Sequence, residues 1–161
     1  MYERNGHTPP RTLLLVNTLK YRLLEDIAIA DACYELHGSN VEEIFQAGFL
    51  ALMETSVELN TVKEVLIKNV LLQHKDLERL FYEFLEELIY LKDAELLIFK
   101  NCKLSVTKDD ITDTFKLDAI LSGQEFNKSV STLTDVKAIT YYQFYIKQID
   151  DGWESRITFD L

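Results

Sequence analysis

Two spacings of apolar residues divide the chain into predicted helices and predicted strands. The clearest helix follows Asp76, a residue type that commonly caps a helix N-terminus. Beyond it, apolar residues keep the i, i+3, i+4, i+7 spacing of an amphipathic helix: Leu77, Leu80, Phe81, Phe84, Leu85, Leu88 and Leu91. A second helix is predicted over residues 40 to 56, because Ser39 and Glu42 have the spacing of a capping box and an apolar face follows them. Each helix therefore has one broad stripe to bury.

Alternating apolar and polar residues predict strands along most of the remaining chain. The strand-like segments before the longest one cover residues 21–25, 30–37, 62–72, 96–99, 104–106 and 115–121. Gly123 is interpreted as a turn, the longest alternating run extends from Val136 to Ile146, and Asp151-Gly152 predicts a hairpin into the final strand. The expected fold is α+β, with one or more mostly antiparallel sheets of six or more strands and two main helices packed on one side.

The last strand carries an aspartate directly before the final residue of the sequence. With a period of two, Ile157 and Phe159 share one face, so Asp160 points away from the core. If Leu161 is the natural terminus, its α-carboxylate lies one residue further along. Both groups offer the hard oxygen ligands that Ca²⁺ and Mg²⁺ prefer.

A second strand aspartate, Asp31, lies between the small residues Ala30 and Ala32 on the polar face of its segment. Aspartate is depleted in strands, so two such residues suggest a reason for their presence. One interpretation is that Asp31, Asp160 and the terminal carboxylate bind one divalent cation. The other is that each aspartate faces solvent on an edge strand, where charge discourages aggregation.

The charge balance bears on the kind of partner. Seventeen Lys and Arg residues against twenty-seven Asp and Glu residues give a net charge of −10, and no basic stripe interrupts the acidic pattern. A nucleic-acid-binding surface needs clustered Lys and Arg, so strong direct binding to nucleic acid is disfavoured. An acidic protein can still meet a basic protein partner, because complementary charge speeds their encounter.

The length of 161 residues is that of one domain. Residues 1–18, which include Pro9-Pro10, are expected to form a loosely ordered extension, and residues 19–161 the domain. No apolar run approaches the roughly 18 residues of a membrane span, and the N-terminus lacks the layout of a secretory signal. We therefore expect a cytoplasmic protein without a membrane partner.

Enzyme motifs with a recognisable spacing are missing from the sequence. It has no phosphate-binding glycine loop, no nucleophile elbow and no paired-histidine zinc motif. His7, His37 and His74 are scattered, and nothing indicates a partner for any of them as a general base. Cys33 and Cys102 lack the spacing of a zinc site or a disulfide framework and are expected to be packing residues. The chain is therefore expected not to be an enzyme, and no catalytic residue is assigned.

From about Tyr21 to Leu161 the chain resembles the archease family, small proteins that assist the GTP-dependent tRNA-splicing RNA ligase. The resemblance covers most of the chain in the right order, and the pattern V-K-A-x-T-Y together with a terminal F-D-x is specific. The matching segments are Ala30-Asp31 leading to Gly38 and Val41-Glu42-Glu43, the helix from Leu85 to Asp93, the segment from Val136 to Tyr141, and Gly152-Trp153 leading to Phe159-Asp160-Leu161.

The resemblance implies a function and a site. It implies a non-catalytic protein cofactor that activates the ligase, promotes its guanylylation and supports multiple turnover. In this family the equivalents of Asp31, Asp160 and Leu161 are thought to bind a divalent cation. Ca²⁺ is favoured, with Mg²⁺ or Mn²⁺ as alternatives. Lys137 is a further candidate for a functional or partner contact.

The chain departs from the family pattern at two places. Ala28-Ile29 stands where the family has His-Thr, and Tyr142 stands where the family often has a histidine after Thr-Tyr. Because hard cations prefer oxygen ligands, these changes leave the predicted cation ligands intact. Two other functions remain open at this point: a metal-dependent phosphoester hydrolase that uses the same carboxylates, and a metal-free, chaperone-like interaction domain.

Overall fold

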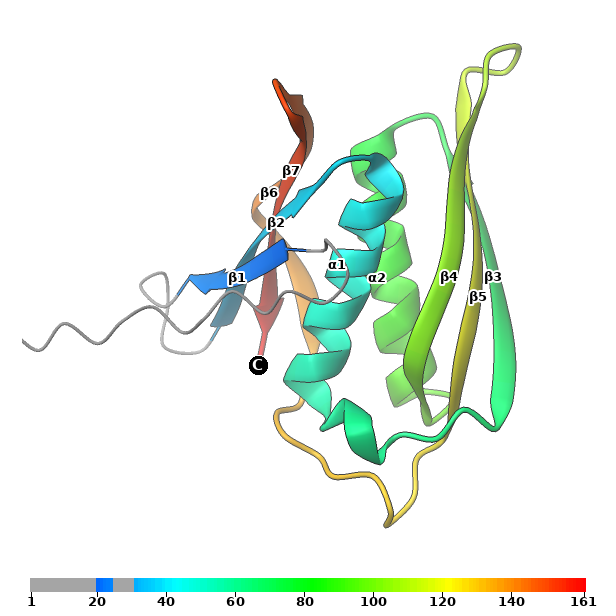
Figure 1. Ribbon diagram of the computed structural model, residues 1–161, viewed down its shortest axis with the longest axis vertical. Coiled ribbons are helices and arrows are strands. Elements are labelled where there is room, and N and C mark those ends of the chain that lie inside the picture. Colours follow the sequence, from blue (N-terminus) through cyan, green and yellow to red (C-terminus); the bar gives the residue numbers. More distant parts are fainter. Residues whose placement is uncertain (1–19, 25–30) are drawn as a thin grey trace, which may run out of the picture.

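The computed structural model describes residues 20–24 and 31–161, and it places two helices between two antiparallel sheets (Figure 1). The four-stranded sheet has the order β1-β2-β7-β6, and the three-stranded sheet has the order β3-β5-β4. Each sheet therefore has the helices on one face only, which confirms the predicted α+β class with its mostly antiparallel strands and two main helices. The predicted extension over residues 1–18 lies outside the described residues.

The elements follow one another in a simple order along the chain. The strands are β1 (Lys20–Leu24), β2 (Asp31–Gly38), β3 (Leu66–His74), β4 (Leu97–Asp109), β5 (Thr114–Glu125), β6 (Ala138–Ile149) and β7 (Gly152–Asp160). The helices are α1 (Val41–Ser56), the short 3₁₀ helix η1 (Leu59–Thr61) and α2 (Leu77–Asp93). Within the described residues, no helix is both long and apolar enough to span a lipid bilayer.

Both long helices begin where capping groups satisfy their first backbone N–H groups. The N-cap of α1 is Asn40, one residue later than the Ser39 predicted from the sequence, and its Oδ1 accepts a hydrogen bond from the Glu43 N–H at 2.9 Å. The Glu43 carboxylate accepts in return from the Ser39 N–H at 2.7 Å. The two hydrogen bonds resemble the predicted capping box, but they involve Asn40 and Glu43 in place of Ser39 and Glu42. Asp76 caps α2 as predicted.

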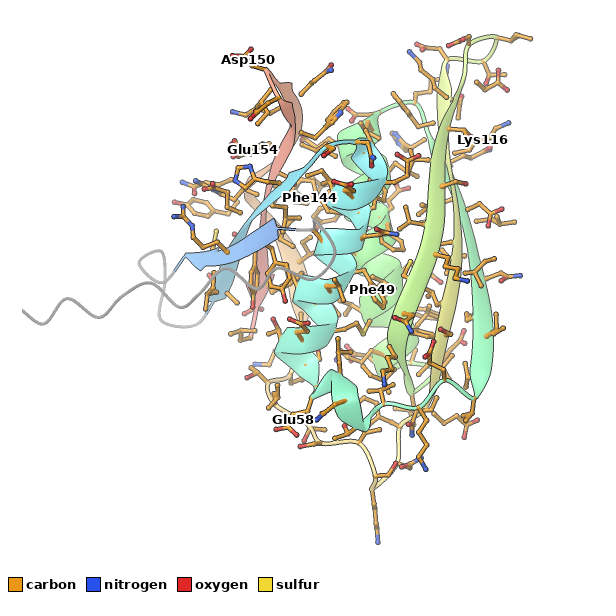
Figure 2. The ribbon with its side chains drawn as sticks, in the orientation of Figure 1. Phe49, Glu58, Lys116, Phe144, Asp150 and Glu154 are labelled. Carbon is orange, nitrogen blue, oxygen red and sulfur yellow. The ribbon has the colours of Figure 1, made fainter. Side chains whose placement is uncertain are left out.

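The core lies between the sheets and contains both helices. The Phe45 ring of α1 meets the Phe81 ring of α2 with centroids 4.6 Å apart, and Phe81 also packs against Phe144 of β6. Gly48 permits this close helix contact, because a Cβ there would stand 2.7 Å from the Phe81 ring. Phe49 and Phe144, labelled in Figure 2, enter the core from α1 and from the four-stranded sheet.

The regular alternation predicted from Val136 to Ile146 is wrong, because β6 contains a wide bulge. Thr140 pairs with Thr158 of β7 and Tyr145 pairs with Arg156, so residues 141–144 lie opposite a single residue of β7. Within the bulge, Gln143 has a positive φ of 55°. The bulge therefore breaks the period of two that the sequence suggested.

The bulge attaches β6 to the second helix. It turns Phe144 into the core and lays the ring of Tyr141 flat on the ring of Tyr82 in α2, with centroids 3.9 Å apart. Arg79 lies over both tyrosine rings, and the Tyr82 hydroxyl donates to the Ile139 carbonyl at 2.9 Å. These contacts stabilise the irregular backbone.

Gly123 does not form the turn predicted for it, because it lies inside β5. It faces the place where the pairing of β4 with β5 shifts register, between Phe99 and Asn101. A Cβ at Gly123 would stand 2.0 Å from the Ile98 carbonyl oxygen. The glycine is therefore required by a close backbone approach within the sheet.

Candidate metal site

Asp31 and Asp160 lie directly opposite each other at one end of the four-stranded sheet. They are register partners in the antiparallel pair of β2 with β7. Directly opposed residues point to the same face, with Cβ atoms about 4.5–5.5 Å apart. Their neighbours Ala32 and Phe159 are buried in the core, so both carboxylates project from the opposite face, where both residues are partly exposed. The fold thus brings together two aspartates that lie far apart in the sequence.

Lys137 holds the residues that follow β7. Its backbone N–H donates to the Asp160 carbonyl at 2.9 Å, and its ammonium donates to the Leu161 carbonyl at 3.1 Å. Leu161 itself is half-buried and packs against the hydrophobic core. Lys137 therefore fixes Leu161 beside the aspartate pair, which places all four residues predicted from the sequence within one region.

Two threonine hydroxyls lie in the next row of the same sheet face. Thr158 of β7 pairs with Thr140 of β6, and this pair lies two residues along each strand from the pair of Asp160 with Ala138, so it is on the same face of the sheet. The Thr158 side chain is 2% exposed, and neither hydroxyl oxygen has a hydrogen-bond partner among the described residues. A buried hydroxyl without a partner costs about 1–3 kcal/mol, and such a group commonly marks a bound water or ion.

The donor set fits a hard cation. The two carboxylates, the backbone oxygen of Leu161 and the neighbouring hydroxyls are all oxygen donors, which Ca²⁺ and Mg²⁺ prefer over nitrogen or sulfur. Ala138, the register partner of Asp160 on β6, carries only a methyl group. The residues present therefore suit the divalent cation expected from the sequence.

The two departures from the family pattern are placed differently. Ala28-Ile29 lies outside the described residues. Tyr142 lies in the β6 bulge and is 60% exposed, so its side chain is accessible at the surface of the sheet. Thr140 and Thr158 were not predicted as site residues from the sequence. Thr158 is two residues before Asp160, so the period of two of a strand already placed it on the same face as that aspartate.

The fold and the opposed carboxylates define a small α+β protein with a candidate oxygen-ligand site where its first and last long strands meet. A family model described as "Archease protein family (MTH1598/TM1083)" matches residues 21–161. The chain belongs to the archease family, which confirms the resemblance inferred from the sequence.

Individual relatives support the assignment. The chain is 32% identical to protein archease of Pyrococcus abyssi over 134 residues, which cover 82% of this chain and 93% of that protein. It is 35% identical to protein archease of Thermococcus kodakarensis over the same shares of the two chains. Membership therefore rests on most of the chain and not on the terminal motif alone.

Two solved structures share the fold. The solution structure of Methanobacterium thermoautotrophicum protein 1598 matches with a TM-score of 0.73 and 25% identity, over 88% of this chain and 98% of that one. The crystal structure of an archease, described as a possible chaperone, from Thermotoga maritima matches with a TM-score of 0.58 and 17% identity, over 83% and 93%. The second likeness shows the fold alone.

Proposed function

We propose that this protein is a non-catalytic cofactor of a GTP-dependent tRNA-splicing RNA ligase, which promotes guanylylation of the ligase and its multiple turnover. A divalent cation, Ca²⁺ before Mg²⁺ or Mn²⁺, is held by Asp31, Asp160 and the α-carboxylate of Leu161. The observation that carries the proposal is the direct pairing of Asp31 with Asp160, in a chain that belongs to the archease family.

The roles of the residues follow from their positions. Asp31 and Asp160 present carboxylate oxygens on the face opposite the core. Lys137 positions Leu161 through its carbonyl and offers an exposed ammonium near the site. The cation, when bound, supplies a fixed positive charge at this end of the sheet. The protein residues hold oxygen ligands in place and form the surface that meets the partner.

The net charge of −10 supports a protein partner over an RNA ligand. An enzyme that handles RNA needs a basic surface for the phosphates, and an acidic activator is attracted to such a surface by long-range electrostatics. Binding is therefore expected to weaken as the salt concentration rises.

The direct test is multiple-turnover RNA ligation and ligase guanylylation, measured with the cognate ligase in the presence and absence of this protein. Wild type is expected to raise both rates, and Asp31→Asn and Asp160→Asn to lose the effect while remaining folded. Asp118→Asn is a matched control, because Asp118 is an exposed strand aspartate on the outer face of the other sheet. Equal guanylylation with and without the wild-type protein would refute the proposal.

The two alternatives give different results in the same assays. A metal-dependent phosphoester hydrolase would turn over substrate without any ligase, and Asp160→Asn would abolish that turnover. A metal-free chaperone-like domain would act equally well in a chelator and with both aspartates replaced. The Thermotoga maritima archease is described as a possible chaperone.

A further inference from the structure

A second group of metal-binding side chains lies on the same sheet face as Asp31 and Asp160, further along the same two strands. Glu35 and His37 alternate on β2, and the register pairs His37 with Glu154 of β7. Nε2 of His37 is 2.8 Å from Oε1 of Glu35, and one donor atom from each of the three residues lies within 4.8 Å of the other two. Glu154 is labelled in Figure 2, on the same outer side of the four-stranded sheet.

The two arginines near the Glu35 carboxylate contact only one of its oxygens. Oε2 lies 3.5 Å from an Arg22 nitrogen and 3.8 Å from an Arg156 nitrogen, whereas Oε1 faces His37. Arg156 is held in turn by the Gln143 side chain at 3.0 Å. The oxygen turned toward the imidazole therefore contacts neither arginine, and an ion bound between it and Nε2 would replace their direct contact.

The Glu154 carboxylate is held in the same way. Its Oε1 accepts a hydrogen bond from the Tyr145 hydroxyl at 2.7 Å and lies 3.5 Å from the Lys147 ammonium. The hydrogen bond from Tyr145 is the largest cause that lowers the pKa of Glu154; burial opposes it, and the charge of Lys147 adds a smaller lowering effect. Outer contacts of this kind pre-orient metal ligands and contribute to metal affinity.

We propose that Glu35, His37 and Glu154 form a second cation site, selective for a divalent transition ion such as Zn²⁺ over Ca²⁺. One imidazole with two carboxylates suits Zn²⁺, whereas Ca²⁺ prefers oxygen alone. The His37 side chain is 38% exposed and the two glutamates about half as much, so an ion can enter from solvent. Three protein ligands leave a fourth coordination position for water or for a donor group from another molecule.

The competing state of this cluster is a network of ion pairs without a metal. Arg22 and Lys147 have side chains that are 52% and 58% exposed, so their pairs with the glutamates are weak and water can replace them. Arg156 is the more buried cation, and it contacts only the far oxygen of Glu35. Both arginines therefore contact the Glu35 oxygen that lies away from His37, and the Lys147 contact with Glu154 is exposed to water.

The inference is independent of the ligase and of the Asp31–Asp160 pair, because the two sites share no ligand. The test is calorimetric titration of Zn²⁺ into the full chain, with the absorption spectrum of Co²⁺ as a report of the ligands. Wild type is expected to bind one Zn²⁺ ion at this site. His37→Ala and Glu154→Gln are expected to weaken that binding at least tenfold, while His74→Ala and Asp160→Asn leave it unchanged.

Two controls keep the result interpretable. Glu154→Gln preserves the shape of the side chain, and circular dichroism of each variant excludes unfolding as the cause of lost binding. Burial raises the pKa of the Cys102 thiol to about 12 and Cys33 is 1% exposed, so thiolate bands in the Co²⁺ spectrum are not expected. Stoichiometric binding that survives both ligand substitutions would place the ion elsewhere, and no binding by wild type would mean an ion-pair network only; either result would overturn the inference.

Discussion

Replacing Asp160 with asparagine should change stability in opposite directions with and without calcium. The two carboxylates are directly opposed in the register of β2 with β7. Two like charges about 5 Å apart repel by about 1 kcal/mol in a water-like medium. Without an ion, Asp160→Asn removes this repulsion and keeps the size of the side chain. In a chelator, the variant is therefore expected to be as stable as wild type, or more stable by up to about 1 kcal/mol.

Calcium should reverse the order of stability. An ion that binds only the folded state adds about 2.7 kcal/mol when its concentration is 100 times the dissociation constant. For a chain of this length, that corresponds to a rise of roughly 5–11 °C in Tm, at about 2–4 °C per kcal/mol. Asp160→Asn loses one of the carboxylates and is expected to gain little.

The assay is thermal unfolding of wild type and Asp160→Asn, followed by circular dichroism in EDTA and in excess Ca²⁺. Asp118→Asn serves as the control, because Asp118 is an exposed aspartate in β5, which belongs to the three-stranded sheet, whereas β2 and β7 belong to the four-stranded sheet. A wild-type Tm that does not rise with Ca²⁺, or an equal rise in the Asp160 variant, would refute the shared site. A variant that is much less stable in EDTA would show that the aspartate has a structural role.

Three further predictions concern the scaffold. Phe81→Ala removes a fully buried ring between Phe45 and Phe144 and should cost about 3–5 kcal/mol of unfolding free energy, measured by urea denaturation. Gly123→Ala should cost about 3 kcal/mol in the same assay, because the new methyl group meets backbone and not a movable side chain; a neutral result would contradict the close approach. Burial, followed by the hydrogen bond to Glu154, raises the pKa of Tyr145 to about 12 from its ordinary value of 10. Its contribution to stability is thus complete below pH 10 and lost as pH rises through 12, and Tyr145→Phe should show a smaller loss across that window.

The helices could be predicted from the sequence because their signals are local. The apolar stripe of α2 and its cap at Asp76 lie within one short segment, and the structure has both. The difference at α1 is small for the same reason: Ser39 and Asn40 are both good capping residues, and the backbone conformation decides between them. Local physical chemistry fixes these elements to within a residue.

The β6 bulge could not be predicted, because its cause lies elsewhere in the chain. Residues 141–144 have the aromatic and polar types of an ordinary strand, so their sequence reads as regular alternation. What stabilises the bulge is the stack of Tyr141 on Tyr82 and the burial of Phe144, both of which depend on α2. A similar non-local cause, the approach of Ile98, explains why Gly123 was mistaken for a turn.

For the candidate sites too, the local features could be predicted from the sequence and the non-local ones could not. Alternation alone predicted that Asp31 and Asp160 face away from the core, and burial of their neighbours agrees. That they meet is a matter of register between distant strands, which no local pattern specifies. The pattern left the shared cation as one of two interpretations, and the family resemblance favoured it. Glu35, His37 and Glu154 were equally visible as polar alternating residues, but their convergence depends on the same register.

The place of β7 in the sheet order has a consequence for how the chain folds. The strand lies between β2 and β6 although it follows every other element in the sequence. During synthesis, β2 therefore remains without this neighbour until residues 152–160 have left the ribosome. Pairing between such distant segments is slow because the intervening chain must first be ordered. Until then the nascent polypeptide exposes one unpaired edge of a partly apolar strand, and the risk of aggregation through that edge lasts until β7 pairs with it.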